Sequence, residues 1–164
     1  MSMTWAGFLG IDTGPHTGIF GAWWDTADWA LKYCTAFECA DADSAAELHA
    51  MLDDPYARPV RAAGIEAFVA RAKSVRLRGV RTARVMGQVT ELSGVLRGYG
   101  IPVTARPAGT VKPWATDKRL AAAGLLEAAG SSPHIRDAGR HMLFTACQAG
   151  VPDPLSAIAK RAGA

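Results

Sequence analysis

Four residues in this chain have side chains that could bind cations together. Asp12 and Glu66 each follow an apolar segment that is typical of a buried strand. A lone carboxylate beside the centre of a sheet is costly to keep ionised, so each needs a positive partner. His134 and Asp137 are three residues apart, a spacing that places both on one face of a helix. These four residues are therefore the first candidates for a functional site.

Each candidate also has an ordinary structural explanation. Asp12 could accept hydrogen bonds from the amides of Gly14 or His16 in the turn that follows it. Glu66 could form a simple ion pair with an arginine at the end of its strand. His134 and Asp137 could merely cap the first turn of their helix, where a negative charge is favourable.

The combination predicts more than its parts do. Three carboxylates and one imidazole that meet at one edge of a sheet would repel one another unless divalent cations lay among them. Oxygen-rich sites with open positions suit magnesium or manganese. Paired metal ions of this kind activate water and stabilise the leaving oxygen in phosphodiester cleavage.

The elements that must position these residues follow from hydrophobic pattern and turn residues. We expect one α/β domain over residues 1–164, with a basic tail over about 152–164. Strands are expected over residues 5–11, 17–24, 29–37 and 60–65, with a fifth that opens at 101–103. Helices are expected over residues 44–51, 82–99, 117–129 and 134–149, with a loop at 107–114.

Composition restricts the class of protein. The chain has no run of 18 or more apolar residues, so no transmembrane helix is expected, and its N-terminus lacks the pattern of a secretory signal. Cys34, Cys39 and Cys147 show no paired spacing. We therefore expect small buried thiols in a reducing cytoplasm rather than zinc ligands or disulfides.

Charge is distributed unevenly along the chain. Residues 1–66 contain ten Asp and Glu against three Lys and Arg, and residues 67–164 contain five against fifteen. Residues 67–84 hold six basic residues and no acidic one: Arg71, Lys73, Arg76, Arg78, Arg81 and Arg84. Such a run is often a solvated helix face or a loop. Directly after a carboxylate, it predicts a phosphate-binding segment.

The helix expected over residues 82–99 has a regular apolar stripe. Its members have spacings of 4, 3, 4 and 3: Val85, Val89, Leu92, Leu96 and Tyr99. The stripe could pack into the core of the same chain or form a helix-to-helix dimer interface. Gly87 and Gly94, seven residues apart, would let another backbone approach closely.

Four motifs in this order resemble one protein family. They are Gly-Ile-Asp-x-Gly-x-x-Thr-Gly at residues 10–18, Ile-Glu-x-Phe at 65–68, Val-Lys at 111–112 and His-x-x-Asp-Ala at 134–138. The set resembles the RuvC-type Holliday-junction resolvases, over residues 8–149. The resemblance implies a ribonuclease H-like α/β fold, a five-stranded mixed sheet with helices on both faces. It also implies a homodimer that holds branched DNA, without a nucleotide cofactor or a membrane.

The resemblance also implies roles for individual residues. Asp12, Glu66 and Asp137 match the metal-binding carboxylates of the family, and His134 matches the fourth ligand. Together they would hold two magnesium ions, or manganese, in each active site. Lys112 matches the lysine near the scissile phosphate, where it could stabilise developing negative charge.

Three further residues are candidates for DNA contact. Phe68 matches an aromatic residue near the junction centre, although core packing would explain it as well. Lys118 matches another lysine of the family, and Trp114 could belong to the core or stack on a base.

We therefore expect a metal-dependent endonuclease that resolves four-way junctions by paired symmetric nicks. One alternative is a broader nuclease for flaps and forks. Another is a catalytically silent DNA-binding module that retains the acidic cluster for stability. The first motif alone also resembles a phosphate loop of actin-like ATPases, but 164 residues leave no room for the second domain of such enzymes.

Overall fold

A mixed five-stranded sheet forms the centre of the protein. The computed structural model describes residues 4–54, 57–68 and 72–162. The strands lie in the order β3-β2-β1-β4-β5. β1 pairs antiparallel with β2 and parallel with β4, β2 pairs antiparallel with β3, and β4 pairs parallel with β5. Their bounds are β1 Trp5–Asp12, β2 His16–Asp25, β3 Leu31–Ala40, β4 Val60–Ala67 and β5 Val103–Pro107.

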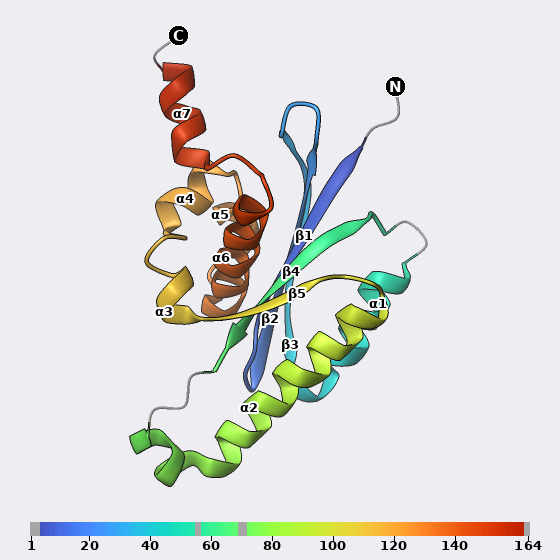
Figure 1. Ribbon diagram of the computed structural model, residues 1–164, viewed down its shortest axis with the longest axis vertical. Coiled ribbons are helices and arrows are strands. Elements are labelled where there is room, and N and C mark those ends of the chain that lie inside the picture. The colour runs from blue at the N-terminus through green and yellow to red at the C-terminus, as the bar shows by residue number, and fades with distance from the viewer. Residues whose placement is uncertain (1–3, 55–56, 69–71, 163–164) are drawn as a thin grey trace.

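Helices cover both faces of this sheet (Figure 1). One face carries α1 (Ser44–Asp53) and α2 (Ala72–Gly98), with the short 3-10 helix Asp41–Asp43 before α1. The other face carries α4 (Asp117–Ala122), α5 (Leu126–Ala129) and α6 (Pro133–Gln148). α3 (Ala108–Val111) follows β5, and α7 (Pro154–Ala162) ends the described chain. The expected α/β fold, with helices on both faces, is confirmed.

The sheet separates two hydrophobic cores, and β1 contributes to both. Phe8 packs among the residues of α6, whereas Leu9 and Ile11 pack with α1 and α2. Successive side chains of a strand point to opposite faces. A continuous apolar run is therefore what a strand buried on both faces requires. The same alternation directs Asp12 toward the face that α6 covers.

Glycines let α6 lie directly on the sheet. A Cβ atom at Gly10 of β1 would lie 2.0 Å from the carbonyl oxygen of Ala138. A Cβ atom at Gly64 of β4 would lie 2.3 Å from the hydroxyl of Thr145. No side chain fits in these gaps, so the backbone of α6 approaches the strands closely. This contact positions the first turn of α6 beside the ends of β1 and β4.

Helix α2 begins ten residues earlier than expected, at Ala72 rather than at residue 82. The basic segment is therefore mostly helical. Its first turns extend past the end of the sheet (Figure 1), where no apolar face is needed. Arginine, lysine, leucine and alanine all favour a helix intrinsically, so a helix forms there without hydrophobic periodicity.

The apolar stripe of α2 belongs largely to the core of its own chain. Leu92 and Leu96 are fully buried, and Val89 packs against the same cluster. Assigning Leu92 and Leu96 to a dimer interface was therefore wrong, because side chains buried within the chain cannot form an exposed seam. Val85 is half-buried, and the hydroxyl of Tyr99 donates to Asp53 at 2.5 Å.

Other differences from expectation have local causes. The helix expected over residues 117–129 is broken into α4 and α5 at Gly124, whose φ of 74° does not continue a helix. β3 begins at Leu31 rather than at Trp29, because Trp29 closes a turn in which its amide donates to the carbonyl of Asp25 at 2.8 Å. The expected loop at 107–114 contains α3, and the expected tail contains α7.

The three cysteines are half-buried and free of disulfides. Burial raises the pKa of the Cys147 thiol to about 12. Within the described ranges, no helix is both long and apolar enough to cross a membrane.

Candidate active site

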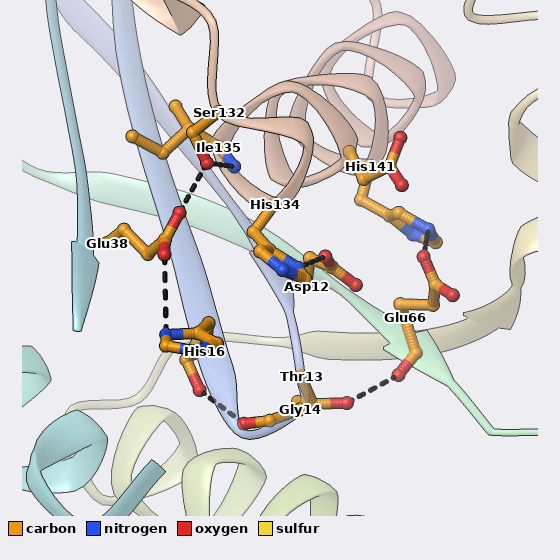
Figure 2. A network of polar contacts seen from close by, with 12 residues as sticks. Asp12, Thr13, Gly14, His16, Glu38, Glu66, Ser132, His134, Ile135 and His141 are labelled. Atoms are coloured by element: carbon orange, nitrogen blue, oxygen red, sulfur yellow. Dashed lines mark hydrogen bonds and ion pairs between the residues drawn. The ribbon is translucent and has the colours of Figure 1, made fainter. Parts of the chain in front are cut away.

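Side chains from three elements meet at the carboxyl ends of β1 and β4. Ile11 and Ile65 are register partners on these parallel strands, so the next residues, Asp12 and Glu66, emerge side by side. The N-terminus of α6 lies against the same edge. There the Nδ1 atom of His134 is 3.0 Å from Oδ2 of Asp12 (Figure 2).

For Asp12 and for the start of α6, the ordinary explanations do not describe the structure. The amide of Gly14 donates to Oε1 of Gln88 at 2.9 Å, not to Asp12. The cap of α6 is Ser132, whose hydroxyl accepts from the amide of Ile135 at 3.3 Å. The side chains of Asp12 and Asp137 are therefore available to interact with one another's neighbours at the carboxyl ends of β1 and β4.

Lys112 completes this cluster from the end of α3. Its Nζ atom donates to Oδ2 of Asp137 at 2.6 Å and lies 3.6 Å from Oε2 of Glu66. The five residues predicted for the reaction are therefore brought together, although they are spread over more than 120 positions of the chain: Asp12, Glu66, Lys112, His134 and Asp137.

The two strand-end carboxyl groups differ in their affinity for protons. Burial, together with the charges of Glu66 and Asp137, raises the pKa of Asp12 to about 7, against a smaller opposing effect of His134. Burial also acts to raise the pKa of Glu66, but His141 and the charge of Lys112 outweigh it and the pKa is lowered. In the metal-free protein Glu66 is therefore the ionised member of the pair, and Asp12 is readily protonated.

The carboxylates suit a divalent cation in their chemistry. Hard oxygen donors are what magnesium and manganese prefer. Oε2 of Glu66 is buried and has no hydrogen bond among the described residues, although Lys112 and His141 lie 3.6 Å and 3.4 Å from it. However, no group of three or more His, Cys, Asp or Glu side chains in the described ranges has an arrangement that could hold a metal ion. Lys112 supplies the positive charge in this arrangement.

Two residues at the site escaped the sequence analysis. Arg140 donates to both Asp137 and Asp117, and it contacts Oδ1 of Asp137 whereas Lys112 contacts Oδ2. His141 is only 1% exposed, and its Nε2 atom is 3.4 Å from Oε2 of Glu66. The helical spacings of three and four from Asp137 were a usable signal for both.

A second polar network joins the turn after β1 to the start of α6. The ring of His16 stacks on that of His134 with centroids 5.9 Å apart, and its Nδ1 atom is 3.5 Å from Glu38. The hydroxyl of Ser132 donates to the same Glu38 (Figure 2). This network connects β2, β3 and α6 around His134.

Gln88 connects the same turn to α2. Its Nε2 atom donates to the hydroxyls of Thr17 at 2.6 Å and Ser44 at 3.2 Å. No spacing in the sequence marked this buried amide.

The residues predicted for DNA contact lie on several elements of the chain. Phe68 is 40% exposed just beyond β4, and Arg81 and Lys118 are exposed. Arg84 forms an ion pair with Asp41, so it does have a counter-charge. Arg71 and the side chains of Lys73, Arg76 and Arg78 lie outside the described part of the structure.

Trp114 belongs to the packed interior rather than to an open surface. It is half-buried against the core on the α6 side, and its ring meets that of Phe144 edge to face at 5.3 Å. The guanidinium of Arg119 covers it at 4.5 Å. Of the two explanations for this tryptophan, the structure favours core packing over base stacking.

The fold has a counterpart among solved structures. The chain is similar to T. thermophilus RuvC in complex with a Holliday junction substrate, with a TM-score of 0.62 and 18% sequence identity. The similarity covers 89% of this chain and 97% of that chain. No family model and no curated protein sequence matches the chain. The protein thus has a RuvC-like, ribonuclease H-like fold, as its motifs indicated.

Proposed function

We propose that this protein is a metal-dependent, structure-specific DNA endonuclease that resolves four-way junctions by paired symmetric nicks. One observation carries the proposal: Asp12, Glu66, His134 and Asp137 converge at one edge of a RuvC-like sheet. The similar solved structure holds a Holliday junction substrate, which supports branched DNA as the ligand class.

The proposed chemistry depends on two magnesium ions, with manganese as a possible substitute. Asp12, Glu66, His134 and Asp137 would hold them after a rearrangement in which Lys112 leaves the carboxylates, because their present positions do not form a metal-holding group. When bound, such a metal pair supplies an activated water and stabilises the leaving oxygen. The residues of the chain set the geometry: α6 positions His134 and Asp137, and the strand ends position the other two carboxylates.

Lys112 would act on the substrate directly. Partial burial acts to lower its pKa, but the bond to Asp137 and the charge of Glu66 raise it overall. The ammonium group therefore stays charged at neutral pH. Once the carboxylates have another counter-charge, Lys112 can turn toward a phosphate and stabilise the negative charge that develops there.

DNA binding would involve the segment after Glu66. Phe68 would lie near the junction centre, and the basic first turns of α2 would contact backbone phosphates together with Lys118. These contacts position DNA without reading its sequence.

We also propose a homodimer, formed through the outward side of α2. Val80 is 88% exposed and Met86 is 54% exposed on this helix. A Cβ atom at Gly87 or Gly94 would have no described neighbour within 4 Å, so another backbone could approach closely there. Two-fold symmetry in the protein would match the approximate two-fold symmetry of a junction.

A cleavage assay tests the function. A labelled synthetic four-way junction is incubated with wild-type protein in magnesium, beside a linear duplex and a flap. We expect paired symmetric nicks in the junction, and none with Asp12→Asn, which should still bind. Cleavage of the flap at a similar rate would favour the broader nuclease. Binding without cleavage in magnesium or manganese, together with no metal binding in calorimetry, would favour the silent DNA-binding module.

The basic segment has its own expected result. Replacing Arg76, Arg78 and Arg81 with alanine should weaken junction binding and reduce its salt dependence. The log–log slope should fall by about 0.9 for each phosphate that the variant no longer neutralises, because fewer counterions are released. Binding titrations at several salt concentrations measure the slope. Arg97→Ala, at the other end of the same helix, is the control and should leave it unchanged. A triple variant with the wild-type slope would show that the segment does not touch phosphate.

A further inference from the structure

His141 is a buried polar side chain that the proposed reaction does not use. It lies on α6, one turn after Asp137, and is only 1% exposed. Neither ring nitrogen has a hydrogen-bond partner among the described residues. Nε2 nevertheless points at Glu66 and lies 3.4 Å from its Oε2 atom, which itself has no hydrogen-bond partner in the described chain (Figure 2).

A histidine buried without a hydrogen bond at either ring nitrogen is unfavourable unless it has a role. A buried polar group without a hydrogen bond destabilises the fold, and an apolar residue of similar volume would avoid that loss. The surroundings are closely packed, because a Cβ atom at Gly64 would lie 2.9 Å from the carbonyl oxygen of His141. The His141 backbone is therefore packed against β4, and its side chain is buried with Nε2 facing the carboxylate of Glu66.

Lys112 and His141, the two neighbours of the Glu66 carboxylate, differ in how freely their side chains can move. Lys112 reaches Oε2 of Glu66 from the more exposed side and shares its ammonium group with Asp137. Its side chain is long and partly exposed, so it can move to a phosphate. His141 contacts the same oxygen from the interior and is fixed by packing. When Lys112 turns to the substrate, His141 is the neighbour that remains.

We propose that His141 is a positioning residue that fixes Glu66 from the protein interior. A carboxylate only accepts hydrogen bonds, so the Nε2 atom of His141 must carry the proton directed at Oε2. Direct metal binding by His141 is disfavoured. A metal-bound histidine normally donates a hydrogen bond from the N–H of its other ring nitrogen, and Nδ1 of His141 has no hydrogen-bond partner among the described residues. The catalytic part of this inference rests on the proposed function of Glu66.

Cleavage kinetics of two substitutions test the proposal. His141→Leu removes the N–H group but keeps an apolar side chain in the space. We expect kcat for junction cleavage to fall about 10- to 100-fold, as for other residues that orient metal-binding side chains, with KM nearly unchanged. His141→Gln keeps an N–H donor at similar reach and should restore most of kcat. Met142→Leu, a volume-conserving change at the buried neighbour of His141, is the matched control and should cleave normally.

The outcomes separate a positioning role from a merely structural one. Wild-type kcat in His141→Leu would overturn the proposal, and so would a Gln variant as impaired as the Leu variant at equal thermal stability. If His141→Leu does not fold, His141→Phe, which keeps a ring, takes its place.

A second measurement does not depend on nuclease activity. A double-mutant cycle of Glu66→Gln and His141→Leu, followed by chemical unfolding of metal-free protein, measures the coupling between the two side chains. We expect the unfolding equilibrium constants to deviate about fivefold or more from additivity. If the wild type cleaves no branched DNA but the coupling is present, the proposed function fails and the contact stands. Additive effects would refute the contact itself.

Discussion

Asp12→Asn is expected to abolish cleavage and, at the same time, to stabilise the metal-free protein above pH 7. Burial and the charges of Glu66 and Asp137 raise the pKa of Asp12 from 3.8 to about 7. An ionised Asp12 is therefore unfavourable in the folded state without a metal. Asparagine keeps the shape and a carbonyl oxygen for His134 but carries no charge.

The pH dependence of this effect has a definite sign. The folded-state pKa lies above the unfolded value, so folding takes up a proton between pH 3.8 and about 7. The stability associated with protonated Asp12 is fully present below pH 3.8 and is lost as pH rises to about 7. The loss is at most about 4 kcal/mol, at 1.36 kcal/mol per unit of pKa. Urea unfolding of both proteins from pH 4 to 8 should show Asp12→Asn gaining on the wild type across this window and then keeping a constant advantage.

Asp137→Asn is the matched control within the same site. Asp137 contacts both Lys112 and Arg140, so its replacement leaves two cations without their shared partner. Cleavage should again be abolished, but here the metal-free protein should be destabilised, by about 1–3 kcal/mol. Equal stability changes in the two variants would contradict the distribution of charge described here.

Gly10→Ala is expected to cost at least about 3 kcal/mol of stability, at the upper end of the range for overpacking. The added Cβ atom would lie 2.0 Å from the carbonyl oxygen of Ala138 and 2.4 Å from the amide of Met142. Both contacts are with backbone, so α6 as a whole must move away from β1. Because α6 carries His134 and Asp137, cleavage should fall as well. Chemical denaturation and the junction assay measure the two effects.

Gly109→Ala is the control for this substitution. Gly109 lies in α3, where an added Cβ atom would have no described neighbour within 4 Å. Alanine should leave stability unchanged or raise it by about 0.5–1 kcal/mol, because it favours a helix more than glycine does. A Gly10→Ala protein as stable as this control would show that α6 does not rest on the glycines of the sheet.

Much of the site could be predicted from the sequence, because its main residues are marked by local patterns. Asp12 and Glu66 follow apolar runs, and a strand buried on both faces must end where the chain becomes polar. His134 and Asp137 have helical spacing directly after a helix start at Ser132 and Pro133. The order of the four motifs along the chain then indicated a RuvC-like fold, and the similarity to the solved RuvC structure confirms that fold.

Only the tertiary structure decided which surfaces and partners these residues have. Leu92 and Leu96 have the same spacing whether they face their own core or a second copy, and the packing of α2 on the sheet selects the core. The first turns of α2 extend past the end of the sheet, so no hydrophobic period in the sequence marked them as helical.

The contacts of Lys112 with Asp137, and of His141 with Glu66, join residues far apart in the chain. They exist because α6 rests on Gly10 and Gly64, an approach that depends on the distance between two backbones. The sequence by itself determined which residues could do the chemistry and which strands and helices carry them, because short-range pattern is enough for that. Their partners, burial and charge state were set by how closely those elements pack.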